Sequence, residues 1–163
     1  MPNNTTPALV LTTAGDTIAN SYATIGEDGS IPAGDVLVTL AQLDRLGEIS
    51  GKKGLLLTEK DSPEGVQLPL DQLDLIEIRF PGFADGRGYS FATLLRRRGF
   101  QGELRASGDV FKDVLYYLKR VGFSSFIIKA GKSIDEAKAG LQDFKAGYQA
   151  STAEPVAHYQ VGR

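Results

Sequence analysis

Basic side chains and glycine-bearing turns recur at the ends of three predicted strands. Arg79 precedes the turn Asp85-Gly86-Arg87-Gly88, Arg105 precedes Ser107-Gly108-Asp109, and Lys129 precedes Gly131. Guanidinium groups bind tetrahedral oxyanions through paired hydrogen bonds, and the N–H groups of helix N-termini can complete the shell. The pattern predicts a site for a small oxyanion: phosphate, sulfate or carboxylate.

The candidate residues fall into three groups by their expected role. The predicted anion-binding residues are Arg79, Arg87, Arg105, Ser107 and Lys129, the loop-forming glycines are Gly86, Gly88 and Gly108, and the candidate acid–base groups of a catalytic site are Asp85 and Asp109.

Structural alternatives remain open for most of these residues. Glu77 could pair with Arg105, and Arg79 with Glu103, in an internally neutral ladder across neighbouring strands. Asp85 could hydrogen-bond the backbone of its own turn, where Gly86 and Gly88 would be simple turn glycines. The run 96–98, three arginines, is expected to be a solvated helix end favoured by the helix dipole.

Other site chemistries have little support in the sequence. The chain contains no cysteine, which excludes thiolate catalysis and cysteine-ligated zinc or iron–sulfur sites. Its single histidine, His158, lies in the tail and is expected to have no catalytic role. Asp85, Asp109 and Asp113 form only a weak magnesium pattern, so we expect no metal site. The sequence identifies no cofactor, because it contains neither GxGxxG nor a Walker motif.

The elements that position these residues follow a strand–helix rhythm. Strands are predicted at 75–80, 102–107 and 125–130, with helices at 89–98, 110–121 and 131–148. Asp109 could cap the second helix, and Ser133 and Glu136 form a capping-box pattern at the third. Helical crossovers of this length require parallel strands. The predicted fold class is therefore α/β, with consecutive βα units forming a mainly parallel sheet.

The N-terminal half adds further strands to this prediction. Short strands are expected at 8–13, 16–25, 36–40 and 54–59, with a short helix at 41–49, and we expect the N-terminal strands to extend one edge. An open sheet is preferred to a barrel, since 163 residues are few for eight βα units. We expect a single domain over 1–163, with a strand-rich extension to about residue 50, a core of about 51–148 and an irregular tail from about 149.

Charge and hydropathy exclude two classes of partner. The chain has 18 Lys and Arg against 20 Asp and Glu, a formal net charge of −2, whereas nucleic-acid binders are usually basic. No apolar stretch approaches the roughly 20 residues of a membrane helix, and the N-terminus has no signal-peptide pattern. We expect a cytoplasmic protein that binds neither nucleic acid nor membrane.

One long segment resembles a known family. The stretch FPGFADGRGYSFATLLRRRGFQGELRASGDVFKDVLYYLKRVGFSSF resembles the bacterial DUF934 family, with similarity over about residues 75–128. The matching positions are Asp85, Gly86, Arg87, Gly88, Ser90, Leu95, Arg96, Gly102, Glu103, Leu104, Arg105, Ala106, Gly108, Asp109, Asp113, Arg120, Gly122 and Phe123. Val114, Val121 and Ser124 replace residues that are often Gln, Cys and Asp in the family, so a catalytic thiol at position 121 is not expected.

The resemblance implies two functions of different classes. Family members are usually encoded beside sulfite reductase and phosphoadenylyl-sulfate reductase and are often labelled oxidoreductases of sulfite reduction. The first hypothesis is an accessory or anion-binding protein of assimilatory sulfate and sulfite reduction, with either enzyme as partner. The alternative is an oxidoreductase that acts on a small anionic substrate at the strand-end site of DGRG and GELRASGD. The missing cysteine and cofactor motifs favour the first, because redox enzymes need an electron carrier.

Overall fold

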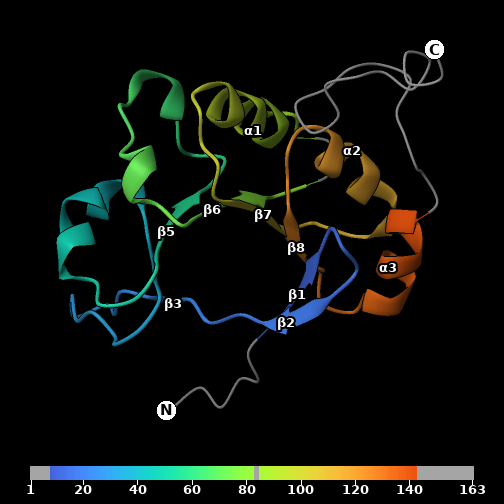
Figure 1. The fold of residues 1–163 in the computed structure, drawn as a ribbon, viewed down its shortest axis with the longest axis horizontal. Coiled ribbons are helices and arrows are strands. Elements are labelled where there is room, and N and C mark those ends of the chain that lie inside the picture. Colours follow the sequence, from blue (N-terminus) through green and yellow to red (C-terminus); the bar gives the residue numbers. More distant parts are fainter. Residues whose placement is uncertain (1–7, 83–84, 143–163) are drawn as a thin grey trace.

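The computed structural model describes residues 8–82 and 85–142, which form one sheet with helices against one face (Figure 1). The strands are β1 (Leu9–Thr12), β2 (Thr17–Ala19), β3 (Ala23–Thr24), β4 (Val36–Val38), β5 (Lys53–Leu57), β6 (Leu75–Phe80), β7 (Glu103–Gly108) and β8 (Ser125–Ile127). The helices are α1 (Arg87–Arg97), α2 (Leu115–Arg120) and α3 (Ile134–Gln142), with 3₁₀ helices at Leu40–Glu48, Pro63–Gly65, Leu70–Gln72 and Lys112–Val114.

The eight strands are arranged in the order β2-β1-β8-β7-β6-β5-β4-β3. All neighbours from β3 to β8 are parallel, while β1 is antiparallel to both β8 and β2. This arrangement confirms the α/β class and the parallel βα units from β6 onward. The N-terminal strands, however, extend both edges of the sheet, so the expectation of a single extended edge was wrong.

The sheet curls strongly, because its two edge strands are nearly consecutive in the chain. Strands β2 and β3 lie at opposite ends of the strand order, yet only residues 20–22 connect them. The sheet is open in its hydrogen bonding, as expected, but the curl brings its edges close together. Eight strands that were each followed by a full α-helix would need more residues than this chain has. Within residues 8–82 the connections are loops and 3₁₀ helices, with no α-helix.

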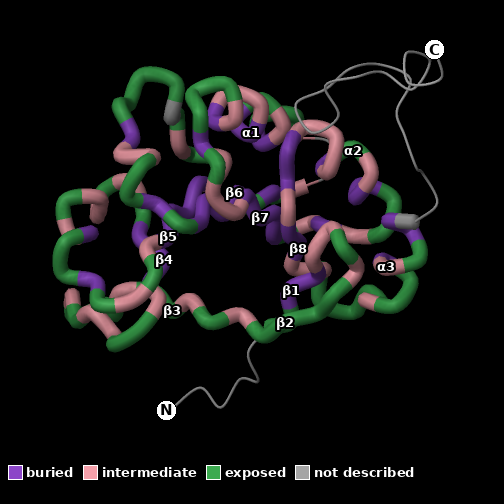
Figure 2. The backbone as a smooth tube through the Cα atoms, in the orientation of Figure 1, coloured by how far each residue is buried: buried purple, intermediate pink, exposed green. Residues whose placement is uncertain are grey.

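The hydrophobic core lies between the convex face of the sheet and the helices. Alternation along β6 directs Ile76, Ile78 and Phe80 to one face, and they share one buried cluster with Phe91 and Leu95 of α1. Figure 2 shows this burial following the central strands. Each fully buried side chain of this kind stabilises the fold by about 1.5–3 kcal/mol, so the core holds β6 and β7 rigidly.

The opposite, concave face carries polar side chains on the same central strands. The concave-face cluster consists of Glu77, Arg79, Glu103, Arg105, Ser107 and Ser125. In the strand register Glu77 lies opposite Arg105, and Arg79 lies opposite Ser107. The period of two along each strand thus separates an apolar helix-facing side from an inner side. On the inner side the charged cluster adjoins a small apolar cluster of Leu37, Leu56 and Leu75.

Two of the predicted helices are wholly or partly 3₁₀ helices in the structure. The predicted helix 110–121 begins later, as a 3₁₀ turn at Lys112–Val114 followed by α2, so Asp109 does not cap it. The predicted helix 41–49 is a 3₁₀ helix, Leu40–Glu48. At α3, the Ser133 hydroxyl accepts the N–H of Glu136 at 3.2 Å, which is one half of the predicted capping box. The predicted tail, 149–163, lies outside the described residues.

Candidate functional site

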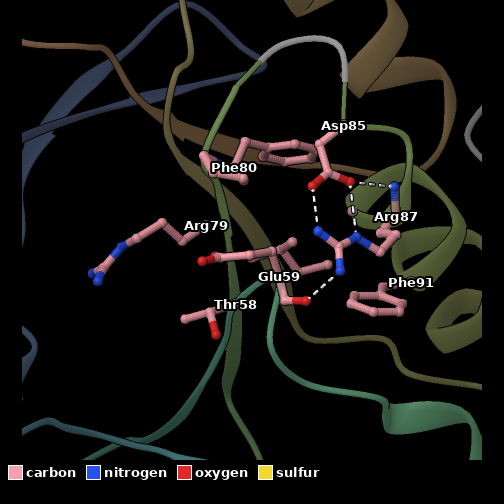
Figure 3. Close-up of a pocket in the computed structure, with 10 residues that line it drawn as sticks. Thr58, Glu59, Arg79, Phe80, Asp85, Arg87 and Phe91 are labelled. Carbon is pink, nitrogen blue, oxygen red and sulfur yellow. Dashed lines mark hydrogen bonds and ion pairs between the residues drawn. The ribbon is translucent and has the colours of Figure 1, made fainter.

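An ion pair fixes the turn between β6 and α1. Asp85 Oδ1 accepts the backbone N–H and the Nε–H of Arg87 at 3.0 and 3.1 Å, and Oδ2 accepts Nη2–H at 2.7 Å. Arg87 Nη1 also donates to the carbonyl oxygen of Glu59 at 2.6 Å (Figure 3). The turn is therefore tied to the segment that follows β5, and both oxygens of Asp85 are engaged.

These hydrogen bonds also define the ionisation of the pair. The Arg87 side chain and backbone lower the pKa of Asp85, and Asp85 in turn raises the pKa of Arg87. Asp85 is thus a carboxylate at neutral pH, which suits an ion pair better than a general acid.

The space beside this ion pair is very small. A cavity lined by Thr58, Glu59, Phe80, Arg87 and Phe91 among others has a volume of about 10 Å³, which is room for about one water molecule. Figure 3 shows the Arg79 side chain directed away from Arg87. A sulfate ion does not fit between Asp85 and Arg87 as they stand.

Arg105 is the most enclosed cation of the concave face. Its side chain is 2% exposed, and it donates to Glu103 Oε1 and Asn20 Oδ1, both at 2.9 Å. Ser125 Oγ lies 3.4 Å from its Nε, and the guanidinium stands 5.5 Å from the centre of the Tyr22 ring. Arg105 thereby holds the 20–22 connection against β7 and helps to keep the sheet curled.

Arg79 and Glu77 form a much looser pair at the carboxyl end of β6. Ser107 Oγ donates to Glu77 Oε1 at 2.6 Å. The Arg79 Nη2 atom lies 3.9 Å from the same oxygen, with 51% of the Arg79 side chain exposed against 4% for Glu77. Arg79 therefore presents its guanidinium to solvent beside the Ser107 position.

The predicted cross-strand ladder takes a different form. Both ion pairs join residues two apart on one strand, Arg79 with Glu77 and Arg105 with Glu103. The serines explain this: Ser107 Oγ donates to Glu77, and Ser125 Oγ donates to Glu103 Oε1 at 2.6 Å. The carboxylates are thus hydrogen-bonded across strands and ion-paired along them.

Lys129 and Asp109 form a further ion pair, just beyond the ends of β8 and β7. Lys129 Nζ lies 3.0 Å from Asp109 Oδ1, and the Asp109 N–H donates to the Phe80 carbonyl oxygen at 2.9 Å. Both candidate acid–base residues, Asp85 and Asp109, are therefore ion-paired.

The three predicted loop glycines have three different roles. Gly108 has φ +87°, and a Cβ there would overlap the carbonyl group of Phe80. Gly88 lies inside α1, where a Cβ would overlap the Phe80 ring, so it permits close packing of helix on strand and is not a turn glycine. Gly86 has φ −76° and open space around its Cβ position, so no steric requirement for glycine exists there.

Arg96 has a structural role that the sequence prediction missed. It donates from Nη1 to the carbonyl oxygens of Phe100 and Gly102, both at 2.9 Å, and from Nε and Nη2 to that of Gly122 at 3.1 and 2.8 Å. The expectation of a solvated helix end was therefore wrong for this residue. One feature of the sequence indicated that Arg96 is partly buried. Arg96 follows the buried Ala92 by four residues, which places it beside the apolar face of α1.

The three predicted arginines do not converge on one point. Arg87 binds the turn and Glu59, Arg105 binds Glu103 and Asn20, and Arg79 extends toward solvent. Within the described ranges no three His, Asp or Glu side chains cluster to hold a metal ion, and His158 lies outside those ranges. No helix in the described part is long and apolar enough to cross a membrane.

Comparison with known proteins identifies a family. Residues 54–159 match the family model described as "Bacterial protein of unknown function (DUF934)". The match covers more than half of the 163 residues and, within the described part of the chain, includes most of β5, all of β6 to β8, and α1 to α3. Neither a curated protein nor a solved structure matches the chain. The chain therefore belongs to the bacterial DUF934 family.

Proposed function

We propose that this chain is a cytoplasmic accessory protein of assimilatory sulfate and sulfite reduction that binds a small oxyanion and acts with sulfite reductase. The sulfur-metabolism part rests on the family resemblance. The anion-binding part rests on one observation: Arg79 stands at the carboxyl end of β6 with its guanidinium exposed and only a 3.9 Å contact to Glu77.

The position of Arg79 supports binding for a general reason. Ligands of α/β sheets bind beyond the carboxyl ends of the strands, and Arg79 and Ser107 are partners there on two adjacent central strands. The guanidinium fork of Arg79 can hold two oxygens of a tetrahedral anion, whereas the Ser107 hydroxyl already donates to Glu77. The Arg87 and Arg105 groups already hold carboxylates at 2.7 and 2.9 Å, so an anion would have to displace those partners.

Glu77 opposes anion binding and sets the geometry that the proposal requires. Its carboxylate lies 3.9 Å from Arg79 and would repel an anion placed between them. The anion must therefore bind the outward side of the guanidinium, away from Glu77. The enzyme alternative would assign acid–base chemistry to Asp85 or Asp109, and the ion pairs of both carboxylates make us favour the binding role.

Thermal unfolding in sulfate, sulfite and phosphate tests the anion site, with chloride of equal ionic strength as the reference. A ligand at 100 times its Kd adds about 2.7 kcal/mol of stability, a Tm rise of several degrees. We expect a saturable rise for the wild type and for Arg87→Gln, and none for Arg79→Gln. If the wild type shows no rise beyond chloride, or Arg79→Gln keeps it, the anion-binding proposal fails.

The partner part of the proposal has a separate test. Purified sulfite reductase and this protein are mixed and separated by size-exclusion chromatography, with and without sulfite. Co-elution at micromolar concentration is expected. Separate elution under both conditions would refute the accessory role while leaving the anion test unaffected.

A further inference from the structure

One oxygen atom of Glu77 lies near two donors at unequal distances. Ser107 Oγ donates to Glu77 Oε1 at 2.6 Å, and Arg79 Nη2 stands 3.9 Å from the same atom. The shorter distance is that of a strong hydrogen bond to a carboxylate, whereas the longer one exceeds the range of a hydrogen bond. Ser107 is therefore the donor that satisfies this oxygen, and Arg79 is a cation that stands close by without binding it.

Burial makes the serine hydrogen bond important for Glu77. The Glu77 side chain is only 4% exposed, and Ser107 is buried beside it. A buried carboxylate that loses a hydrogen-bond donor is destabilised by its lost hydration, so it attracts any other donor within reach. Arg79 would need to move only about 1 Å to form a charge-assisted hydrogen bond of about 2.8 Å. Without the Ser107 hydroxyl, Glu77 would therefore bind the Arg79 guanidinium.

The next pair of strands shows the same arrangement with the ion pair closed. Glu103 Oε1 accepts Ser125 Oγ–H at 2.6 Å and Arg105 Nη2–H at 2.9 Å. The spacing is the same in both places, because each arginine follows its glutamate by two residues on one strand. In both places the serine is also the register partner of the arginine on the next strand. An arginine at this spacing can therefore reach its carboxylate.

The surroundings of the two guanidinium groups explain why one pair is closed and the other open. Asn20 Oδ1 accepts Arg105 Nη1–H at 2.9 Å and the Tyr22 ring stands 5.5 Å away, so the Arg105 side chain is 2% exposed. The Arg79 side chain is 51% exposed, and water that hydrates an exposed guanidinium competes with an ion pair. The open state of Arg79 thus depends on hydration and on a carboxylate that another donor already satisfies.

We propose that Ser107 is a positioning residue of the anion site, because its hydroxyl engages Glu77 and so keeps the Arg79 guanidinium free for the anion. This inference rests on the proposed function, since it concerns the same site. Ser107 donates no hydrogen bond to the anion, because a serine hydroxyl has one proton and that proton is used in the bond to Glu77. Removal of the hydroxyl closes the pair of Arg79 and Glu77, and an anion must then break that pair in order to bind.

Chemical modification in the absence of any oxyanion tests the link between the three residues. Phenylglyoxal modifies accessible arginine side chains, and tandem mass spectrometry measures its rate at Arg79, with the exposed Arg97 as internal reference. The variants are Ser107→Ala, Ser107→Thr, which keeps the hydroxyl, and the double variant Ser107→Ala/Glu77→Gln. We expect slower modification of Arg79 in Ser107→Ala and the wild-type rate in the other two. Unfolding would have the opposite effect, because it would expose Arg79 further.

Sulfate binding then measures the consequence for the site, by thermal unfolding against chloride of equal ionic strength. Ser107→Ala should raise the Kd by roughly tenfold, and Ser107→Thr should bind like the wild type. The double variant should bind at least as tightly as the wild type, because the competing charge of Glu77 is gone. Ser125→Ala is the matched control, since it removes the equivalent hydroxyl beside Glu103, and it should change the Kd by less than about twofold.

Three outcomes would overturn the inference. The first is an unchanged rate of Arg79 modification in Ser107→Ala, and the second is wild-type affinity for sulfate in that variant. The third is a double variant that binds sulfate as weakly as Ser107→Ala, which would mean that the Ser107 hydroxyl contacts the anion itself.

The same measurements separate this inference from the proposed function. If the wild type binds no sulfate, sulfite or phosphate, the anion-binding proposal fails, while the modification rates still decide whether Ser107 controls Arg79. Circular dichroism checks that each variant is folded. If Ser107→Ala does not fold, Glu77→Gln alone takes its place. It should bind sulfate more tightly than the wild type, and unchanged affinity would overturn the inference.

Discussion

Replacing Arg96 by Met should destabilise the fold strongly, although the residue lies in the last turn of α1. The Met side chain keeps much of the aliphatic volume but removes four hydrogen bonds to the carbonyl oxygens of Phe100, Gly102 and Gly122. Each carbonyl group that loses its partner costs about 1 kcal/mol. For three carbonyl groups the loss is roughly 3 kcal/mol, a large part of the about 5–15 kcal/mol that stabilises a typical domain.

Thermal and urea unfolding, followed by far-ultraviolet circular dichroism, measure this loss. A change of about 3 kcal/mol lowers Tm by roughly 6–12 °C in a domain of this size, and the urea midpoint should fall with an unchanged slope. Arg97→Met is the matched control, because Arg97 is the next residue and is exposed. Its effect should stay within about 0.5 kcal/mol.

The comparison of the two variants decides the question. Arg96→Lys should recover only part of the stability, because an ammonium group cannot span three carbonyl oxygens as the guanidinium fork does. If Arg96→Met and Arg97→Met unfold within about 2 °C of each other, the carbonyl contacts of Arg96 do not stabilise the fold and the reasoning is refuted.

Two further predictions concern the turns that follow β6 and β7. Gly108→Ala should lower the free energy of unfolding by more than about 1 kcal/mol, because φ is +87° and the Phe80 carbonyl group blocks a Cβ. Gly86→Ala should leave the free energy of unfolding unchanged or raise it. Urea unfolding of both variants measures the two effects, and equal effects would contradict the prediction. Arg87 lowers the pKa of Asp85 below its ordinary 3.8, so Asp85 stabilises the fold above that pH and loses this contribution as the pH falls through the lowered value. The Tm difference between wild type and Asp85→Asn should therefore be full at neutral pH and shrink in acid, and a difference that stays constant would disprove the linkage.

Local patterns were sufficient to predict the central strands. The alternation of Leu75 to Phe80 predicted β6 with the bounds that the structure shows, and 102–107 differs from β7 by one residue at each end. Alternation records which side of a strand is buried, and that information is local. The spacing of strand starts then required helical crossovers and hence parallel pairing, which the structure confirms.

The positions of the N-terminal strands could not be read from local patterns. β1 and β2 are short runs that would fit either edge of the sheet, and β1 pairs with β8, which lies more than a hundred residues later. The choice of edge depends on long-range partners: the Arg105 contact to Asn20 spans 85 residues and secures the connection between the two sheet edges. Local sequence patterns extend over far fewer residues than the 85 that separate Asn20 from Arg105.

The candidate site, like the fold, could be predicted from the sequence only in part. The sequence by itself determined which basic and acidic side chains stand at the carboxyl ends of the strands, because strand order and side-chain alternation follow from local periodicity. Only the tertiary structure decided which charges neutralise one another. Ser107 and Ser125 hydrogen-bond Glu77 and Glu103 across the strands, Asp85 holds Arg87, and Arg79 is left exposed. The physical reason is that pairing depends on distances of a few ångströms between groups on different elements, and packing alone sets those distances.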